Sequence, residues 1–397
     1  MTEANPQRLL IQYLEPSPAT ATADPARLSD HLAFALGRLP VTDLALGWEL
    51  RAEVVEALRR VIPAEVAVWR WVPVFTDPGT GVLDEHFAVG PDGQAPPPFQ
   101  GLADFRFLCL DQAEAIEVGL ERAVRLGREI DADGVLLDRI RWHSPSASPA
   151  RELTCFCEHS RAAAADDGID LSAISRWAQD AALTLDGRRT LVSVLLGGAG
   201  PEPVTRFLDW RDDTVTRAVG SVSQGLATAG FRTALDVFTP ALARSVGQDL
   251  NTIGKLGEWS KSMTYFEAKG PAAMPFELSG HAKWLSDAGD PDPAAFIADV
   301  LGFAAPGIGA TEAQIGTLKH ESSALAAAVG VERAVVGIDA VGIPGVCEVD
   351  DDDLGARLRA LRTTGFGASP CWDLLLIDND RIERMSAAWA GGTDARE

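Results

Sequence analysis

The sequence predicts an α/β protein of the (β/α)8, or TIM-barrel, class, and two observations support this prediction. Short apolar runs rich in β-branched residues alternate along the chain with longer amphipathic patterns, and helices between buried strands indicate parallel pairing of the strands. Eight such runs in a chain of 397 residues match the eight strands of this barrel. A doubly wound open sheet is the alternative.

The predicted strands are the apolar runs at residues 9–14, 66–75, 105–110, 134–140, 233–238, 262–266, 334–341 and 369–377. Amphipathic patterns predict helices over residues 51–62, 112–130, 212–230 and 351–365. Most of these patterns start with acidic residues and end near glycine or a basic residue, as the helix dipole favours. Trp69 and Trp71 alternate on one face of a predicted strand, so we interpret them as core side chains rather than as a surface for sugar stacking.

The spacing between the fourth and fifth runs is far wider than one helix requires. About 90 residues separate these two runs. We therefore predict a single domain, residues 1–397, in which residues 142–210 form an insertion over the carboxyl-terminal rim with one or two helices of its own. The proline- and glycine-rich segment 91–101 predicts another long loop. Long loops on one rim build a cleft.

Composition argues against two classes of partner. The chain has 35 lysines and arginines against 57 acidic residues, a net charge of −22, and this charge repels phosphate backbones and anionic lipid head groups. We therefore expect no nucleic-acid partner and no membrane partner. The N-terminus MTEANPQRLL lacks a basic region followed by an apolar one, so we expect a cytoplasmic protein. The sequence does not predict an oligomeric state.

The five cysteines form an odd set in a long chain, which favours reduced thiols over a disulfide framework. Cys155 and Cys157 in CFCEH, with His159 and His143 nearby in sequence, could offer soft ligands to zinc. The spacing is C-x-C, however, and a second half-site is missing from the sequence pattern. We therefore predict neither a metal nor a cofactor.

Polar residues gather at the predicted carboxyl ends of strands four to eight, namely Asp138, Arg139, Arg141, Asp236, Tyr265, Glu267, Asp339, Trp372 and Asp373. The carboxyl ends of barrel strands are where the active sites of this fold lie. Glycoside hydrolysis needs one protonated carboxyl, one ionised carboxylate and an aromatic face for the sugar. The sequence therefore predicts a glycoside hydrolase with paired carboxylates at this rim, acting on a carbohydrate.

We assign roles from local surroundings. Asp138 lies beside arginines, which hold an aspartate ionised and suit it to act as nucleophile or base. Glu267, beside Tyr265 and Phe266, is the predicted proton donor. The predicted substrate-binding residues are Arg139, Arg141, Asp236, Tyr265, Asp339 and Trp372. Strand alternation places Asp138 opposite Arg139 and Arg141, unless a bulge redirects them.

Several segments resemble TIM-barrel proteins related to glycoside hydrolases. DGVLLDRIRWHS and the following CFCEHSRAAAADDGIDLSAI are similar to that group's strand-four pattern, DGVxxDYIRFP followed by CFCxxC. FLDWRDDTVTRAV, LDVFTPALARSVGQDLNTIG and EWSKSMTYFEA resemble later segments, so that the similarity covers roughly residues 105–377. The resemblance implies that Asp138 is the strand-four acid, Arg141 its neighbouring arginine and Tyr265 the strand-six tyrosine.

The sequence departs from that pattern at several positions. Arg139 stands where a tyrosine is usual, His143 lies where the proline is expected, and Ser160 replaces the last cysteine. The Asn-Glu pair on strand four and the strand-seven glutamate of the best-known retaining families are also missing.

Two alternative functions follow from the same sequence. A carbohydrate-binding or scaffolding barrel would keep the fold and the aromatic residues without catalysis. A metal-dependent lyase or isomerase would require ligands such as His143, Cys157 and His159 to converge.

Overall fold

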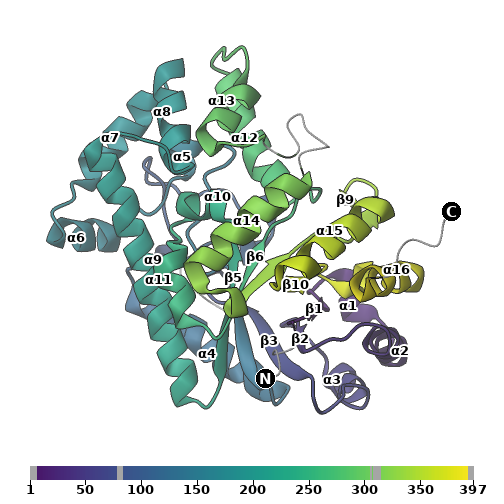
Figure 1. Ribbon diagram of the computed structural model, residues 1–397. Coiled ribbons are helices and arrows are strands. Elements are labelled where there is room, and N and C mark those ends of the chain that lie inside the picture. Colours follow the sequence, from purple (N-terminus) through teal and green to yellow (C-terminus); the bar gives the residue numbers. More distant parts are fainter. Residues whose placement is uncertain (1–6, 78–83, 305, 307–313, 392–397) are drawn as a thin grey trace.

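Eight parallel strands form a closed barrel in the computed structural model, which describes residues 7–77, 84–304, 306 and 314–391 (Figure 1). In spatial order the strands are β1 (Leu10–Tyr13), β2 (Asp43–Leu46), β3 (Ala67–Pro73), β4 (Gly134–Asp138), β5 (Arg232–Phe238), β6 (Ser260–Met263), β7 (Ala334–Gly337) and β10 (Gly367–Ser369). A parallel bridge between Leu9 and Ala368 joins the first strand to the last. The (β/α)8 prediction is therefore confirmed, and the open sheet is excluded.

Helices follow the strands and cover the outside of the barrel (Figure 1). The larger ones around the barrel are α2 (Pro25–Leu36), α3 (Ala52–Arg59), α4 (Ala113–Glu129), α9 (Glu202–Thr228), α14 (Gln314–Val329), α15 (Asp351–Thr364) and α16 (Asn379–Ala390). Short helices α1 (Pro18–Thr22), α10 (Pro240–Ala243) and α11 (Leu250–Ile253) occupy the loops. Local capping sets several boundaries, as where the Asp350 side chain accepts from the backbone N–H of Asp352 at the start of α15.

Residues 105–110 correct one of the strand predictions. They lie in the loop between β3 and α4, where Phe107 and Leu108 form isolated antiparallel bridges with Thr76 and Phe87. Both apolar side chains are buried, and this burial produces a strand-like pattern outside the barrel. The barrel strand that the pattern misses is β2, which has only four residues and carries alanine and leucine in place of β-branched side chains. The predicted eighth run overlaps β10 at Ser369 alone.

The connection between β4 and α9 carries four helices: α5 (Pro149–Glu152), α6 (Glu158–Asp166), α7 (Leu171–Ala181) and α8 (Leu185–Leu195). Because α9 begins at Glu202, the predicted segment 142–210 extends into a barrel helix. The connection after β6 adds α12 (Met274–Ser286) and α13 (Pro293–Leu301). Together these helices form a lobe that rises to one side of the barrel (Figure 1).

The two halves of this lobe are held together by arginines of α8. Arg189 makes a bidentate ion pair with Asp290, with N–O distances of 2.6 and 2.8 Å. Arg188 donates to the carbonyl of Trp284 at 2.6 Å and stacks on its ring. The long connections after β4 and β6 therefore support each other beside the barrel mouth.

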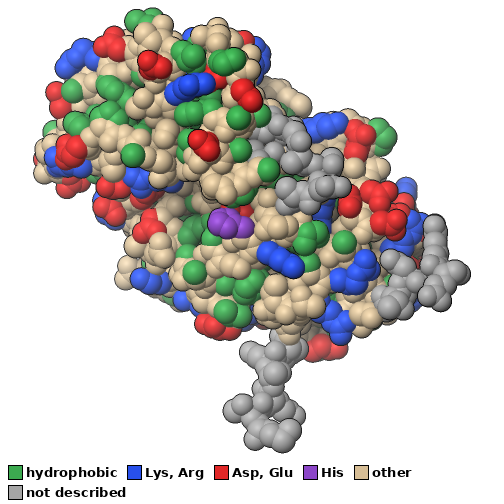
Figure 2. Space-filling view, turned by 45° about the horizontal axis from the view of Figure 1, so that its top comes forward, with side chains coloured by type: hydrophobic (Ala, Val, Ile, Leu, Met, Phe, Trp, Pro, Cys, Tyr) green, Lys and Arg blue, Asp and Glu red, His purple; other side chains and the backbone are tan. Residues whose placement is uncertain are grey.

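The surface carries both signs of charge. Figure 2 shows acidic and basic side chains interspersed over one face of the molecule. Within the described ranges, none of the helices is long and apolar enough to cross a bilayer.

Candidate active site

Asp138 is the last residue of β4, and its side chain is 9% exposed at the carboxyl end of the barrel. Trp71 Nε1 donates to its Oδ2 at 3.1 Å, and the backbone N–H of Arg139 donates to its Oδ1 at 2.6 Å. Both carboxylate oxygens therefore have a donor from a fixed neighbour. Trp71, which the sequence pattern assigns to the core, is buried and also positions Asp138.

Arg139 turns into the same barrel mouth as Asp138. Its φ of 54° lies in the left-handed region, so regular strand alternation ends at this residue. Its Nη1 donates to the Asp104 carbonyl at 2.6 Å and to Asp104 Oδ2 at 2.8 Å, and its guanidinium lies 4.1 Å from the Phe105 ring centre. Arg139 Nε is 3.9 Å from Asp138 Oδ2. The loop before α4 thus fixes a cation beside the strand-four acid.

Glu15 directly follows the end of the first apolar run, and Arg139 Nη2 lies 3.9 Å from its Oε1. Its side chain is 33% exposed. The surrounding protein displaces water from the carboxyl and raises its pKa to about 8; Arg139 opposes this shift, while Asp373 and Asp138 add to it. The sequence analysis does not identify Glu15, although an acid next to a strand end is the signal that could have found it.

Asp236 on β5 forms a buried ion pair with Lys261 on β6. Lys261 Nζ lies 3.0 Å from Asp236 Oδ2 and donates to Tyr265 Oη at 2.8 Å. Burial raises the pKa of Asp236 to about 7, which Lys261 opposes and the nearby Asp138 reinforces. Lys261 is only 1% exposed. This group therefore lies behind Asp138 in the barrel and links it to Tyr265.

Asp339 and Glu267 belong to a positioning network after β6 and β7. Asp339 Oδ2 accepts the backbone N–H groups of Phe266 and, at 2.9 Å, of Glu267, and burial raises the Asp339 pKa to about 6. Glu267 Oε1 accepts from Gln314 Nε2 at 2.6 Å and from Arg357 Nη2 at 3.0 Å. Glu267, the predicted proton donor, therefore has an amide and a guanidinium on one carboxyl oxygen, and its role as donor stays a prediction.

Arg141 is held away from the open mouth. It is 3% exposed and lies between the rings of Phe107 and Phe238, 4.4 and 4.6 Å from their centres. Its Nη1 donates to the Trp142 carbonyl at 3.0 Å, and burial lowers its pKa to about 10. These contacts suit a structural cation better than the predicted substrate-binding residue.

Trp372 and Asp373 follow β10. Trp372 is half-buried, with its ring centre 5.8 Å from that of Tyr265 in an edge-on arrangement. Asp373 accepts the backbone N–H of Leu14 at 2.9 Å and that of Glu15 at 3.1 Å. Trp372 therefore offers partly open aromatic surface, and Asp373 fixes the backbone that carries Glu15.

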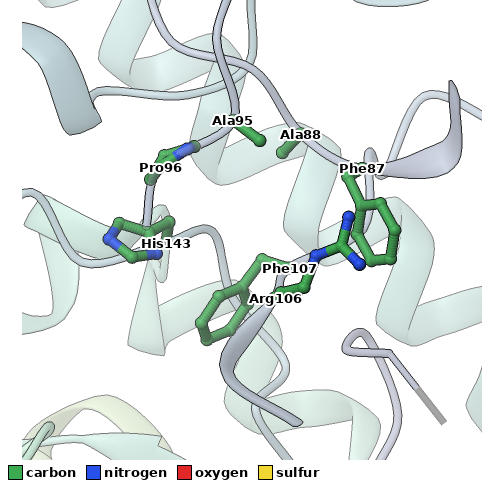
Figure 3. Close-up of a pocket in the computed structure, with 7 residues that line it drawn as sticks. All are labelled: Phe87, Ala88, Ala95, Pro96, Arg106, Phe107 and His143. Atoms are coloured by element: carbon green, nitrogen blue, oxygen red, sulfur yellow. The ribbon is translucent and has the colours of Figure 1, made fainter. Parts of the chain in front are cut away.

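Glu15 and Asp373 line a groove of about 1330 Å³, together with residues of α1, α2 and α16. This volume is ample for an oligosaccharide. A second, much smaller pocket of about 10 Å³ lies beside His143 and Phe107, with Arg106 over the Phe87 ring (Figure 3). Because that volume holds no more than a water molecule, the groove is the better candidate substrate site. Of the acids described above, Glu15 and Asp373 line the groove, whereas Asp138, Arg139 and Trp372 are not among its lining residues.

The ligand set of the metal-dependent alternative does not converge. Across the part of the chain that the structure describes, the only group of three or more potential ligands is Cys109, Cys155 and Cys157. His143 and His159 are not in it, and burial lowers the pKa of His143 to about 3. The geometry therefore does not support the lyase or isomerase that His143, Cys157 and His159 would require.

Solved structures of the same fold include glycoside hydrolases. The glycoside hydrolase domain of PgaB (BpsB) from Bordetella bronchiseptica aligns over 96% of this chain and 98% of its own, with 14% identity and a TM-score of 0.59. Alpha-L-fucosidase isoenzyme 2 from Paenibacillus thiaminolyticus aligns over 97% of this chain and 49% of its own, with 11% identity and a TM-score of 0.52. No protein-family model and no curated protein matches the chain. Likeness at this identity establishes a shared fold, so the chemistry has to be argued from the site.

Proposed function

We propose that this protein is a glycoside hydrolase whose carbohydrate substrate binds at the carboxyl-terminal mouth of the barrel. In this proposal Asp138 is the ionised carboxylate, acting as nucleophile or base, and Glu15 is the proton donor. The observation that carries it is that one guanidinium, Arg139, lies 3.9 Å from a carboxyl oxygen of each acid. Cleavage of a glycosidic bond needs two carboxyls near each other in different protonation states.

The two acids differ in the way this chemistry requires. The pKa of Glu15, about 8, keeps its carboxyl largely protonated at neutral pH. Asp138 instead has an N–H donor on each oxygen and a guanidinium beside it. Glu15 also lines the groove, so its proton can reach a bound sugar.

Asp236 is another acid with a raised pKa beside Asp138, and its geometry makes it a weaker candidate for the donor. It is 2% exposed, and both of its oxygens face Lys261 Nζ, at 3.2 and 3.0 Å. We assign Asp236, Lys261 and Tyr265 to electrostatic support of Asp138. Trp372 supplies the aromatic surface on which a sugar ring would pack.

The test is hydrolysis of a panel of chromogenic and natural glycans by wild type, Asp138→Asn and Glu15→Gln. We expect each substitution to lower turnover on the order of 10² to 10⁴-fold, the usual contribution of such groups. Glu258→Gln is the matched control, because Glu258 pairs with Arg8 and Arg232 at the opposite end of the barrel. Wild-type turnover in both site variants would refute the role assignment.

The same panel distinguishes the carbohydrate-binding alternative. A barrel that only binds would retain an oligosaccharide without releasing product, and Asp138→Asn would leave its affinity largely unchanged. Binding without turnover by wild type, over the whole panel, would therefore favour that alternative over hydrolysis.

A further inference from the structure

Three cysteines from two separate loops converge beside the barrel. Cys109 lies in the loop before α4, whereas Cys155 and Cys157 lie in the insertion after β4, just before α6. Their three Sγ atoms all lie within 4.8 Å of one another, and those of Cys109 and Cys157 are 3.3 Å apart. All three are free thiols. The proposed hydrolysis uses none of them, so their convergence needs a separate explanation.

The spacing of the sulfurs matches a thiolate metal site. Tetrahedral zinc with Zn–S bonds of about 2.3 Å places its sulfur ligands about 3.8 Å apart. One Sγ–Sγ separation is 3.3 Å and the other two are no more than 4.8 Å, so small side-chain rotations would bring all three Sγ atoms onto one ion. Soft thiolates select zinc among the common divalent ions of cells.

A side-chain oxygen that can bind a metal ion lies beside the three thiols, at the fourth corner of the tetrahedron. Ser160 Oγ lies 3.4 Å from Cys109 Sγ and 3.6 Å from Cys157 Sγ. Ser160 is fully buried and donates to Asp111 Oδ2 at 2.6 Å. A carboxylate that accepts from a ligating group is the usual outer partner of a metal ligand. Ser160 Oγ therefore lies where a fourth ligand would complete four-coordination, with Asp111 as its outer partner.

The surroundings also favour a thiolate at Cys157. Its Sγ caps the nine-residue helix α6 and accepts the backbone N–H of Ser160 at 3.4 Å, and a helix N-terminus stabilises negative charge. Metal binding would displace the protons of Cys109 and Cys155 to solvent.

We propose that Cys109, Cys155 and Cys157 bind one zinc ion, with Ser160 Oγ at the fourth position. A closed set of four protein ligands is typical of a structural site rather than a catalytic one. The ion would join the loop between β3 and α4 to the insertion after β4, two segments that flank Asp138 and Arg139. The C-x-C spacing alone does not predict this site, because the third thiol comes from a distant part of the sequence.

The first test is metal analysis of full-length protein purified in reductant without chelator and then incubated with excess Zn²⁺ and desalted. We expect one zinc per chain in wild type, and loss of that zinc in Cys109→Ala and Cys157→Ala. Cys371→Ala is the matched control, because Cys371 is also buried but lies after β10, outside the cluster. Wild type without zinc, or full zinc content in Cys157→Ala, would overturn the proposal.

Two measurements do not depend on cysteine variants that fold. Wild type loaded with Co²⁺ should show the near-ultraviolet thiolate-to-cobalt absorption and the visible bands of a tetrahedral site, and their absence would contradict three thiolate ligands. Ser160→Cys would place a fourth sulfur at the fourth corner, so this variant should hold zinc against a higher concentration of chelator than wild type. Unchanged or weaker retention would overturn the assignment of that corner.

Intact mass measured under native redox conditions tests the competing explanation. A disulfide between Cys109 and Cys157 would lower the mass by two hydrogens and remove two of the three ligands. We expect the reduced mass and a zinc-dependent melting temperature, because an ion that binds only the folded state stabilises it. A stable disulfide in metal-free wild type would refute the zinc site.

Discussion

Arg139 connects the two acids of the candidate site. It is 5% exposed and is held by Asp104 and by the ring of Phe105, so its position does not depend on substrate. A cation fixed in this way stabilises the ionised form of both neighbouring acids, Asp138 and Glu15. Glu15 keeps a raised pKa in spite of Arg139 because loss of solvent outweighs the attraction. The two acids also differ in their hydrogen bonds, because Asp138 accepts an N–H group on each carboxylate oxygen, from Trp71 and from its neighbour Arg139.

A pH profile separates Glu15 from Glu267 as proton donor. Wild-type kcat/KM should fall above about pH 8 as Glu15 loses its proton. Glu15→Gln should remove this basic limb along with most of the activity. Glu267→Gln should keep the limb, because Glu267 is bound to Gln314 and Arg357. Loss of the basic limb in Glu267→Gln, with the limb intact in Glu15→Gln, would reverse the two assignments.

The same raised pKa predicts a pH dependence of stability. The folded state holds the Glu15 proton more tightly than the unfolded state, whose pKa is near 4.5. Relative stability is therefore highest below that value and declines as pH rises through about 8. Urea unfolding from pH 5 to pH 9 should show a steeper loss of unfolding free energy for wild type than for Glu15→Gln. Parallel curves would show that Glu15 titrates normally in the folded protein.

Removal of Lys261 tests the buried ion pair. Lys261→Met leaves Asp236 without its cation, which should lower the free energy of unfolding by about 3–5 kcal/mol at pH 8. The loss should be smaller at pH 5, where Asp236, with its raised pKa, takes up a proton. The double variant Lys261→Met/Asp236→Asn should recover part of the loss. Equal losses at both pH values would contradict a charge-based explanation.

At the scale of elements, the sequence predicts a site residue correctly where the apolar pattern also shows where a strand ends. The strand β4 begins at Gly134 after the long helix α4, so its carboxyl end at Asp138 can be predicted from the sequence. The sequence does not predict Lys261 as a site residue because Lys261 lies inside β6 and not at its end. Its contact with Asp236 follows from the register in which β5 pairs with β6. That register depends on tertiary structure, which periodicity alone cannot provide. The position of Glu15 after a strand end is visible in the sequence, but its approach to Arg139 depends on the tertiary structure.

Arg211 of α9 anchors the insertion after β4 to the barrel. It is fully buried, and its guanidinium donates to the Thr154 carbonyl at 2.7 Å and to the Ser245 carbonyl at 3.1 Å. Arg211→Met leaves both carbonyls without this donor, so we expect a loss of about 2–3 kcal/mol in urea unfolding. Limited proteolysis should cut within residues 139–201 first. Arg217→Met is the control and should change neither result, because Arg217 is exposed and its guanidinium donates to Thr214 of the same helix.

At the scale of the whole molecule, the insertions and the groove lie on different sides of the barrel mouth. The lobe formed by α5–α8 with α12 and α13 lies at the upper left of Figure 1, whereas α1, α2 and α16 lie at the right. The groove follows the latter helices. The groove therefore opens beside α2 and α16, and none of the described residues that line it belongs to the lobe. The cytoplasmic location expected from the sequence stays a prediction.

The charge of the molecule predicts which carbohydrates bind. Among the described residues that line the groove, seven are acidic and three are arginines. The whole chain has a net charge of −22. A carboxylated or sulfated oligosaccharide should therefore bind Asp138→Asn more weakly than a neutral one of equal length in dilute buffer.

Added salt should reduce the difference in affinity between the anionic and the neutral ligand, because the electrostatic screening length falls from about 30 Å at 0.01 M to about 8 Å at 0.15 M. Calorimetric titration of both ligands over this range is the measurement, and the neutral ligand, whose affinity should stay constant, is the control. Tighter binding of the anionic ligand at low salt would mean that the arginines of the groove, Arg27, Arg381 and Arg384, rather than its acids, determine the electrostatic potential there.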